Sequence, residues 1–126
     1  MDTFFPLISG NDLNKKRKLI PDHFSDKPMI IIVAFQRWQQ EFVDEFINRL
    51  EKMNINDSHY ILEIPVIQKS TQFNAMRLDA IMSSAISNPE IRQRTITVYL
   101  DKSEFKNKLG INTEESIYWF LIEKNS

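Results

Sequence analysis

The chain has 126 residues, a formal net charge of −1 and no cysteine. This length suits one domain with a sizeable core, so we expect a single domain over residues 1–126. A net charge near zero gives no field that would attract nucleic acid or anionic lipid, and we expect neither as a partner. Without cysteine, the chain has no disulfide, no thiolate catalysis, no iron–sulfur cluster and no cysteine-based zinc site.

Other residue counts narrow the function classes further. The two histidines, His23 and His59, have no histidine partner at helical spacing, and the two glycines, Gly10 and Gly110, are too few for a phosphate-binding loop. We therefore expect no metal and no cofactor. The longest apolar run, residues 29–35, is too short to span a membrane. Because no basic segment precedes an apolar one at the N-terminus, we expect no signal peptide and a cytoplasmic protein.

Residues 1–27 are interpreted as an N-terminal extension or edge strand, because Pro6, Gly10 and Pro21 interrupt any longer pattern. Within them, residues 16–20 predict a short edge strand. The basic run at residues 15–18 lies among acidic residues and has no interleaved aromatics, which favours a solvated edge over a nucleic-acid site.

The segment at residues 29–53 joins a strand directly to a helix. Met29–Phe35 is apolar throughout, as expected for a central strand covered on both faces. The residues that follow repeat at helical spacing, which predicts an amphipathic helix. We expect its apolar stripe to be buried in the core; the stripe consists of Phe42, Val43, Phe46, Ile47, Leu50 and Met53.

The remainder alternates strands and helices. We expect a second central strand at Tyr60–Ile67 and a short helix that begins at an N-cap, Ser103, and ends at Gly110. The order predicts an α/β layered sheet with right-handed crossovers. The other expected elements are a helix over Thr71–Ile86, an alternating strand over Arg94–Leu100 and a very apolar last strand over Ile117–Ile122.

This pattern resembles the thioredoxin-like superfamily in its TlpA and peroxiredoxin-type form, over about residues 4–125. The resemblance implies a three-layer α/β fold with a mixed central sheet flanked by helices. A narrower similarity is to the cysteine-poor thioredoxin-like group that includes the mitochondrial ATP synthase assembly factor. The segments that carry the resemblance are "DKPMIIIVAF", "QRWQQEFVDEFINRL", "HYILEIPVIQKS", "TVYLDKSEFKNKLGI" and "SIYWFLIEKN".

The departures from that superfamily concern its chemistry. Its two cysteines would fall among residues 39–43, and its cis-proline near Ile117, but this chain has neither. Because a thiolate is the nucleophile in every reaction of that site, thiol–disulfide and peroxidase activity are excluded. We also expect no counterpart of the family's final hairpin strand and C-terminal helix.

The strand–helix junction is the first candidate binding site. It lies at the carboxyl end of a central strand, where open α/β sheets usually bind ligands, and the helix presents free N–H groups there. Arg37 would bind an anion and Trp38 would offer a flat stacking surface. The alternative is that Trp38 packs against the N-terminal segment and Arg37 is a solvated charge. The candidate residues are Gln36, Arg37, Trp38, Gln39, Gln40 and Glu41.

The last strand is the second candidate, as an interface. A strand covered on both faces explains its composition, and so does a core strand whose open edge pairs with another chain. The interface candidates are Ile117, Tyr118, Trp119 and Phe120. His59, Tyr60 and Glu63 are possible acid–base groups, but His59 and Glu63 would lie too far apart on a strand to interact. All three are interpreted as strand-end polar residues.

These observations favour a redox-inactive thioredoxin-like protein that acts as a protein-interaction or assembly module, with a protein partner or with itself. Whether it is an enzyme stays open, although the sequence leans against it. The alternative is a non-redox enzyme, or a small-molecule or anion-binding protein, that uses the junction around Arg37. That alternative requires a concave pocket at the junction together with a carboxylate of raised pKa. A purely structural homodimer subunit is a third reading.

Overall fold

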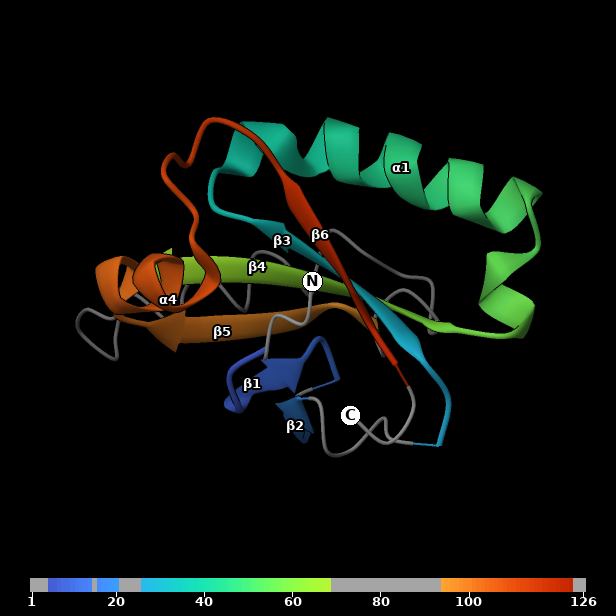
Figure 1. The fold of residues 1–126 in the computed structure, drawn as a ribbon, viewed down its shortest axis with the longest axis horizontal. Helices are drawn as coiled ribbons and strands as arrows, with labels where there is room; N and C mark the ends of the chain where they lie inside the picture. The colour runs from blue at the N-terminus through green and yellow to red at the C-terminus, as the bar shows by residue number, and fades with distance from the viewer. Residues whose placement is uncertain (1–4, 15, 21–25, 69–93, 124–126) are drawn as a thin grey trace.

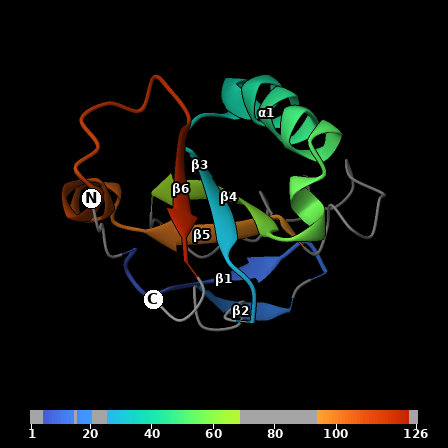
Figure 2. The same cartoon turned by 45° about the vertical axis from the view of Figure 1, so that its right-hand side comes forward.

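The computed structural model describes residues 5–14, 16–20, 26–68 and 94–123. Six strands form one mixed sheet in the order β2-β1-β5-β4-β3-β6 (Figures 1 and 2). The three central strands run parallel, and β1, β2 and β6 run antiparallel to their neighbours. The strands are β1 (Ile8–Asp12), β2 (Arg17–Ile20), β3 (Met29–Ala34), β4 (Tyr60–Gln68), β5 (Ile96–Leu100) and β6 (Tyr118–Ile122).

Strand β3 is central and buried along its whole length, which confirms the prediction from its composition. Its side chains alternate between two core clusters, because successive residues of a strand point to opposite faces. Ile31 and Val33 belong to the cluster that also contains Phe105. Ile30 and Ile32 belong to the cluster beneath helix α1 (Gln40–Lys52). The sheet is therefore the middle of three layers.

Helix α1 packs on one face of the sheet (Figure 1). The stripe of side chains that it buries is narrower than the sequence predicts. Val43, Ile47 and Leu50 are buried, and each contributes on the order of 1.5–3 kcal/mol to stability. Phe42 and Met53, which belong to the same periodic pattern, are exposed. Their exposure corrects the prediction that the whole stripe is core: Met53 is the C-cap residue beyond the end of α1, and Phe42 meets the exposed Trp38 edge-to-face.

On the other face lies helix α4 (Lys102–Leu109), whose Phe105 packs edge-to-face against Phe5 and Phe35. The predicted N-cap, Ser103, is wrong. The carboxylate of Asp101 accepts hydrogen bonds from the backbone N–H groups of the next turn and caps the helix instead. The predicted end at Gly110 is confirmed, since its φ of 70° is the left-handed conformation that glycine adopts without strain.

The N-terminal residues extend the sheet beyond β5. β1 pairs with β5 on one side and with β2 on the other, so β2 forms one edge. The Asp12 carboxylate closes the turn between them by accepting the N–H groups of Asn14 and Lys16. Gly10 lies so close to β5 that a Cβ there would collide with the carbonyl oxygen of Thr97.

Strand β6 forms the opposite edge, antiparallel to β3, and no described strand pairs with its outer side. The expectation that both its faces are covered is wrong. Tyr118 and Phe120 are half-buried against the core, but Trp119 and Leu121 alternate with them and are exposed. The helix predicted over Thr71–Ile86 lies outside the described residues.

Within the described ranges, neither helix is both long and apolar enough to cross a membrane. In the same part of the chain, acidic and histidine side chains are nowhere grouped closely enough to hold a metal ion.

Candidate functional site: the groove between α1 and β6

The junction between β3 and α1 is held by one buried amide. The Oε1 atom of Gln39 accepts the N–H groups of Phe35 at 2.9 Å and Gln36 at 3.1 Å. Its Nε2 atom donates to the carbonyl oxygen of Glu114 at 2.6 Å. Glutamine suits this place because it offers an acceptor and a donor on one side chain. Gln39 therefore ties the end of β3 and the start of α1 to the segment that leads into β6.

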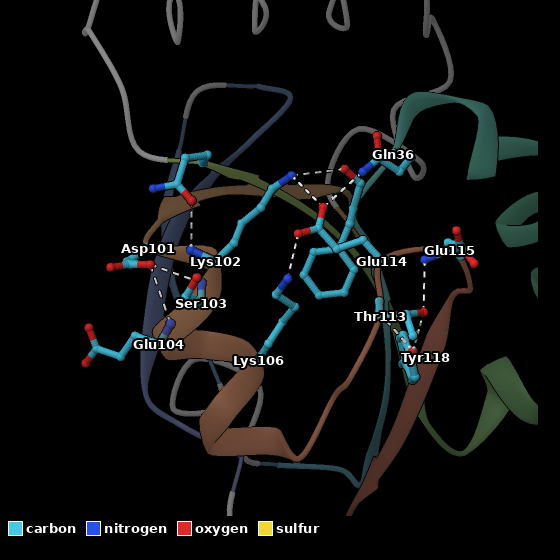
Figure 3. Close-up of polar contacts among 12 residues, drawn as sticks. Gln36, Asp101, Lys102, Ser103, Glu104, Lys106, Thr113, Glu114, Glu115 and Tyr118 are labelled. Atoms are coloured by element: carbon cyan, nitrogen blue, oxygen red, sulfur yellow. Dashed lines mark hydrogen bonds and ion pairs between the residues drawn. The ribbon is translucent and has the colours of Figure 1, made fainter.

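Beside this amide, four polar side chains converge at the carboxyl end of β3 (Figure 3). The Glu114 carboxylate accepts Lys106 Nζ at 2.7 Å, Lys102 Nζ at 3.0 Å and Gln36 Nε2 at 2.9 Å. The hydrogen bond from Lys106, followed by that from Lys102, lowers the pKa of Glu114, although partial burial opposes them. The cluster thus anchors the same segment to α4, and both of its lysines already face a carboxylate.

A groove of about 480 Å³ runs between α1 and β6, within the size range of small-ligand and peptide pockets. Trp38 meets Phe42 edge-to-face at 6.1 Å between ring centroids, and Phe46 meets Trp119 at 5.9 Å. The groove thus has aromatic walls from both elements. Its lining residues are Trp38, Gln39, Phe42, Glu45, Phe46, Arg49, Glu115, Ser116, Ile117 and Trp119.

Exposed apolar side chains gather on this side of the molecule. Among the described residues, six large apolar side chains are exposed. Four of them belong to the groove or to the strand beside it: Trp38 (56% exposed), Phe42 (49%), Trp119 (56%) and Leu121 (48%). Such a concentration is typical of a binding surface, whereas single exposed apolar residues are ordinary.

The two candidate sites of the sequence meet in this groove. Trp38 and Gln39 come from the junction, and Ile117 and Trp119 come from the last strand and the residue before it. Trp119 lies opposite Ile32 in the β3–β6 register, which places it on the same face of the sheet as α1. The sequence separates these residues by about 80 positions, and only the antiparallel pairing of β6 with β3 brings them together.

Other junction residues lie outside the groove lining. Gln36 belongs to the Glu114 cluster, and Glu41 is exposed on α1. Arg37 is exposed and forms no ion pair with a described residue. Of the interface candidates, Tyr118 donates its hydroxyl hydrogen to the carbonyl oxygen of Thr113 at 2.9 Å, which steadies the start of β6 (Figure 3).

The sequence interpretation placed Glu63 among strand-end polar residues, but this carboxylate is buried. Glu63 is only 2% exposed and lies in the middle of β4, so it is not a strand-end residue. Its oxygens accept Gln40 Nε2 at 2.6 Å and Thr95 Oγ1 at 3.3 Å. Burial raises its pKa, although the hydrogen bond from Gln40 opposes that effect. A glutamate flanked by apolar residues within a strand was the signal that could have identified it.

Glu63 does not line the groove, so the pocket and the carboxylate of raised pKa lie apart. The charges of the groove come instead from Glu115 and from Glu45 and Arg49, which form an exposed ion pair on α1 at 2.8 Å. The groove therefore combines apolar aromatic walls with a few charged side chains.

Comparison with solved structures supports the fold, whereas comparison of the sequence identifies no family. No family model matches the chain, and no curated protein matches it. Among solved structures, the chain is similar to the exposed lipoprotein thioredoxin of Streptococcus pneumoniae, with a TM-score of 0.55 and 9% identity over 94% of this chain and 82% of that one. It is also similar to the thioredoxin domain of a thiol-disulfide oxidoreductase from Bacteroides vulgatus, with a TM-score of 0.55 and 12% identity over 100% of this chain and 89% of that one.

The chain therefore has a thioredoxin-like fold, which confirms the fold class expected from the sequence. At the start of α1, where the resemblance places the two cysteines, the chain has the buried Gln39 and Val43 and the exposed Phe42. The fold is retained without the residues that thiol–disulfide chemistry requires.

Proposed function

We propose that this chain is a redox-inactive thioredoxin-like module that binds an extended segment of protein at the groove and at the outer edge of β6. One observation carries the proposal: residues from both sites expected from the sequence line one aromatic groove, beside a strand edge that pairs with no described strand. An edge strand supplies backbone hydrogen bonds, and a neighbouring groove supplies pockets for alternate side chains of the added segment.

The composition of the surface supports protein over a small charged ligand. Trp38, Phe42 and Trp119 present rigid apolar area, the kind of side chain that dominates the energy of protein interfaces. Arg37, the residue on which anion binding would depend, lies outside the groove lining. An assembly role, as in the cysteine-poor group that the sequence resembles, and a cytoplasmic location are further predictions. Identification of the partner and cell fractionation test them.

The experiment is affinity capture of the tagged chain from its own cells, with quantitative mass spectrometry and three variants. Phe42→Ser removes one wall of the groove from an exposed position. Arg37→Glu reverses the charge on which the alternative site depends. Met53→Ser is the matched control, because Met53 is exposed just beyond the other end of α1 and does not line the groove.

We expect Phe42→Ser to reduce recovery of a stoichiometric protein, including untagged copies of the chain itself, while Met53→Ser and Arg37→Glu retain it. If only Arg37→Glu reduced recovery of the protein, the binding site would lie at Arg37, and the anion-binding alternative would be favoured. Equal recovery with all three variants would show that the groove is not the binding surface.

A further inference from the structure

The composition of β6 indicates that its edge is covered in the working protein. Between Ile117 and Ile122 there is no charged residue, no proline and no glycine, and Trp119 and Leu121 are about half exposed. An exposed apolar edge strand without such protection pairs readily with other chains. The opposite edge of the same sheet, β2, begins with Arg17 and Lys18 and is protected in the usual way.

The β6 sequence is complementary to itself in one antiparallel register. If two copies pair around Phe120, each residue faces the one whose number brings their sum to 240. Trp119 then faces Leu121 of the second copy, Tyr118 faces Ile122, and Phe120 faces itself. Directly opposed residues of an antiparallel pair point to the same side of the sheet. In this register odd-numbered residues face odd-numbered ones and even face even, so the same face of each copy lies on one side of the joined sheet.

We propose that β6 pairs antiparallel with β6 of a second copy, centred on Phe120, to form one continuous sheet across a two-fold dimer. This proposal rests on the proposed function and names the extended segment that the edge receives. On the α1 face, the exposed Trp119 and Leu121 of each copy cover those of the other. On the opposite face, Phe120 and Tyr118, which already pack against the core, extend that core across the interface.

Charges select this register over its neighbours. Centred on Phe120, the pairing sets Glu123 against Ile117, and no acidic residue faces another within the strand. Centred on Trp119, it would set Glu115 directly against Glu123, and like charges in directly opposed positions are destabilising. Centred on Leu121, it would set Glu123 against Trp119 and leave less apolar surface matched. A two-fold interface requires such self-complementarity, because the same patch serves both copies.

The test is sedimentation equilibrium of the full chain from about 1 µM to about 1 mM, a range that brackets weak and moderate dimers. Two variants place opposite charges at facing positions: Trp119→Lys and Leu121→Glu. Each alone sets a charge against an apolar residue, so we expect dimerisation about 30-fold weaker or more. Mixed in equal amounts, the two variants form a heterodimer in which the introduced lysine faces the introduced glutamate, while the native Trp119 of one copy faces the native Leu121 of the other. We expect the mixture to recover most of the wild-type association.

Met53→Lys is the control for an added surface charge, since Met53 is exposed and belongs to neither β6 nor the groove. Circular dichroism checks that every variant is folded. A wild-type chain that stays monomeric over the whole range would overturn the dimer, and a mixture that stays monomeric while the wild type dimerises would overturn the register. Either failure leaves the proposed function intact if Phe42→Ser still releases a different protein in the capture experiment.

Discussion

The two edge strands of the sheet, β2 and β6, differ in how far their residues discourage pairing with another chain. β2 and β6 each pair with one neighbour among the described strands, and each has an outer side that no described strand covers. β2 carries Arg17 and Lys18 along its length, whereas β6 carries none of the charges that discourage pairing. Because both edges belong to one molecule under one set of conditions, the difference reflects their use. A protected edge suits exposure to solvent, and an unprotected one suits the partner that we propose for β6.

The edges also differ in how they are fixed to the rest of the chain. β2 follows β1 directly through a short turn that the Asp12 carboxylate closes. β6 arrives from a long segment after α4, and Gln39 and Glu114 hold that segment in place. A hairpin edge depends on local contacts, while the β6 edge depends on contacts between distant parts of the sequence.

The largest expected effect comes from Gln39→Leu, which removes the amide that anchors the β6 edge. It leaves the N–H of Phe35 and the carbonyl of Glu114 without their partner. We expect a loss of about 3 kcal/mol in the free energy of unfolding, because buried unsatisfied groups cost roughly 1–3 kcal/mol each. Urea denaturation measures the loss, and hydrogen exchange should show β6 amides more affected than those of β2.

The neighbouring Arg37→Leu is the control for Gln39→Leu, since Arg37 is exposed in the same turn. We expect it to change stability by no more than about 0.5 kcal/mol. If Gln39→Leu cost less than about 1 kcal/mol, or affected both edges alike, the buried amide would not be the anchor of β6.

The second prediction exchanges a charged and an apolar side chain between the two edge strands. Leu121→Lys gives β6 a charge like that of β2, and Lys18→Leu makes β2 more like β6. We expect the first change to weaken dimerisation by about 30-fold and the second to leave it intact or add further association. Analytical ultracentrifugation of both variants, alone and combined, measures the effect. A chain whose association ignored both changes would show that edge composition does not control pairing.

A third prediction concerns Glu63, in a central strand away from both edges. Since burial raises the pKa of this carboxyl above its ordinary value of 4.5, the folded state disfavours the ionised form. The stability that Glu63 contributes is complete below about pH 4.5 and is lost as pH rises through the folded-state pKa. In Glu63→Gln, the amide oxygen still accepts from Gln40, so we expect the variant to gain stability relative to wild type as pH rises.

Denaturation curves of both chains from about pH 4 to about pH 9 measure that difference. Glu63→Leu is the comparison variant, because it removes the acceptor for Gln40 as well as the charge. A free-energy difference between wild type and Glu63→Gln that stayed constant with pH would contradict the prediction. Because Glu63 lies near the middle of the sheet, its effect on hydrogen exchange should be similar at β2 and β6.

The sequence predicted the layers of the fold better than the roles of individual side chains. The uninterrupted run of β3 and the period of α1 have simple physical causes, and the structure bears both out. The groove could not be derived, because it depends on β6 lying against β3, a pairing between segments about 90 residues apart. Phe42 was assigned to the core, because a helical period gives the direction of a side chain but not where the sheet beneath it ends.

The burial of polar residues was even harder to predict from the sequence than that of apolar ones. Gln39 and Glu63 read as surface residues by type, yet both are buried and hydrogen-bonded to groups distant in the sequence. A buried polar group is stable only if its partners are present, and those partners come from other elements. The junction therefore stays a predicted site, whereas the contacts of each residue in it required the structure.

The smallest expected effect, on the pH dependence of the β6 anchor, comes from Glu114. Hydrogen bonds from Lys106 and Lys102 lower its pKa, so the stabilisation is present above about pH 4.5 and is lost as pH falls through the folded-state pKa. The effect is small because these ion pairs are partly exposed to solvent.

We expect acidification to increase hydrogen exchange in the segment before β6 sooner than in β2. Glu114→Gln should remove that pH dependence while its backbone carbonyl still accepts from Gln39. If acidification increased hydrogen exchange equally at both edges of the wild type, the Glu114 cluster would not be a specific anchor of β6. The β6 edge would then depend on Gln39 alone.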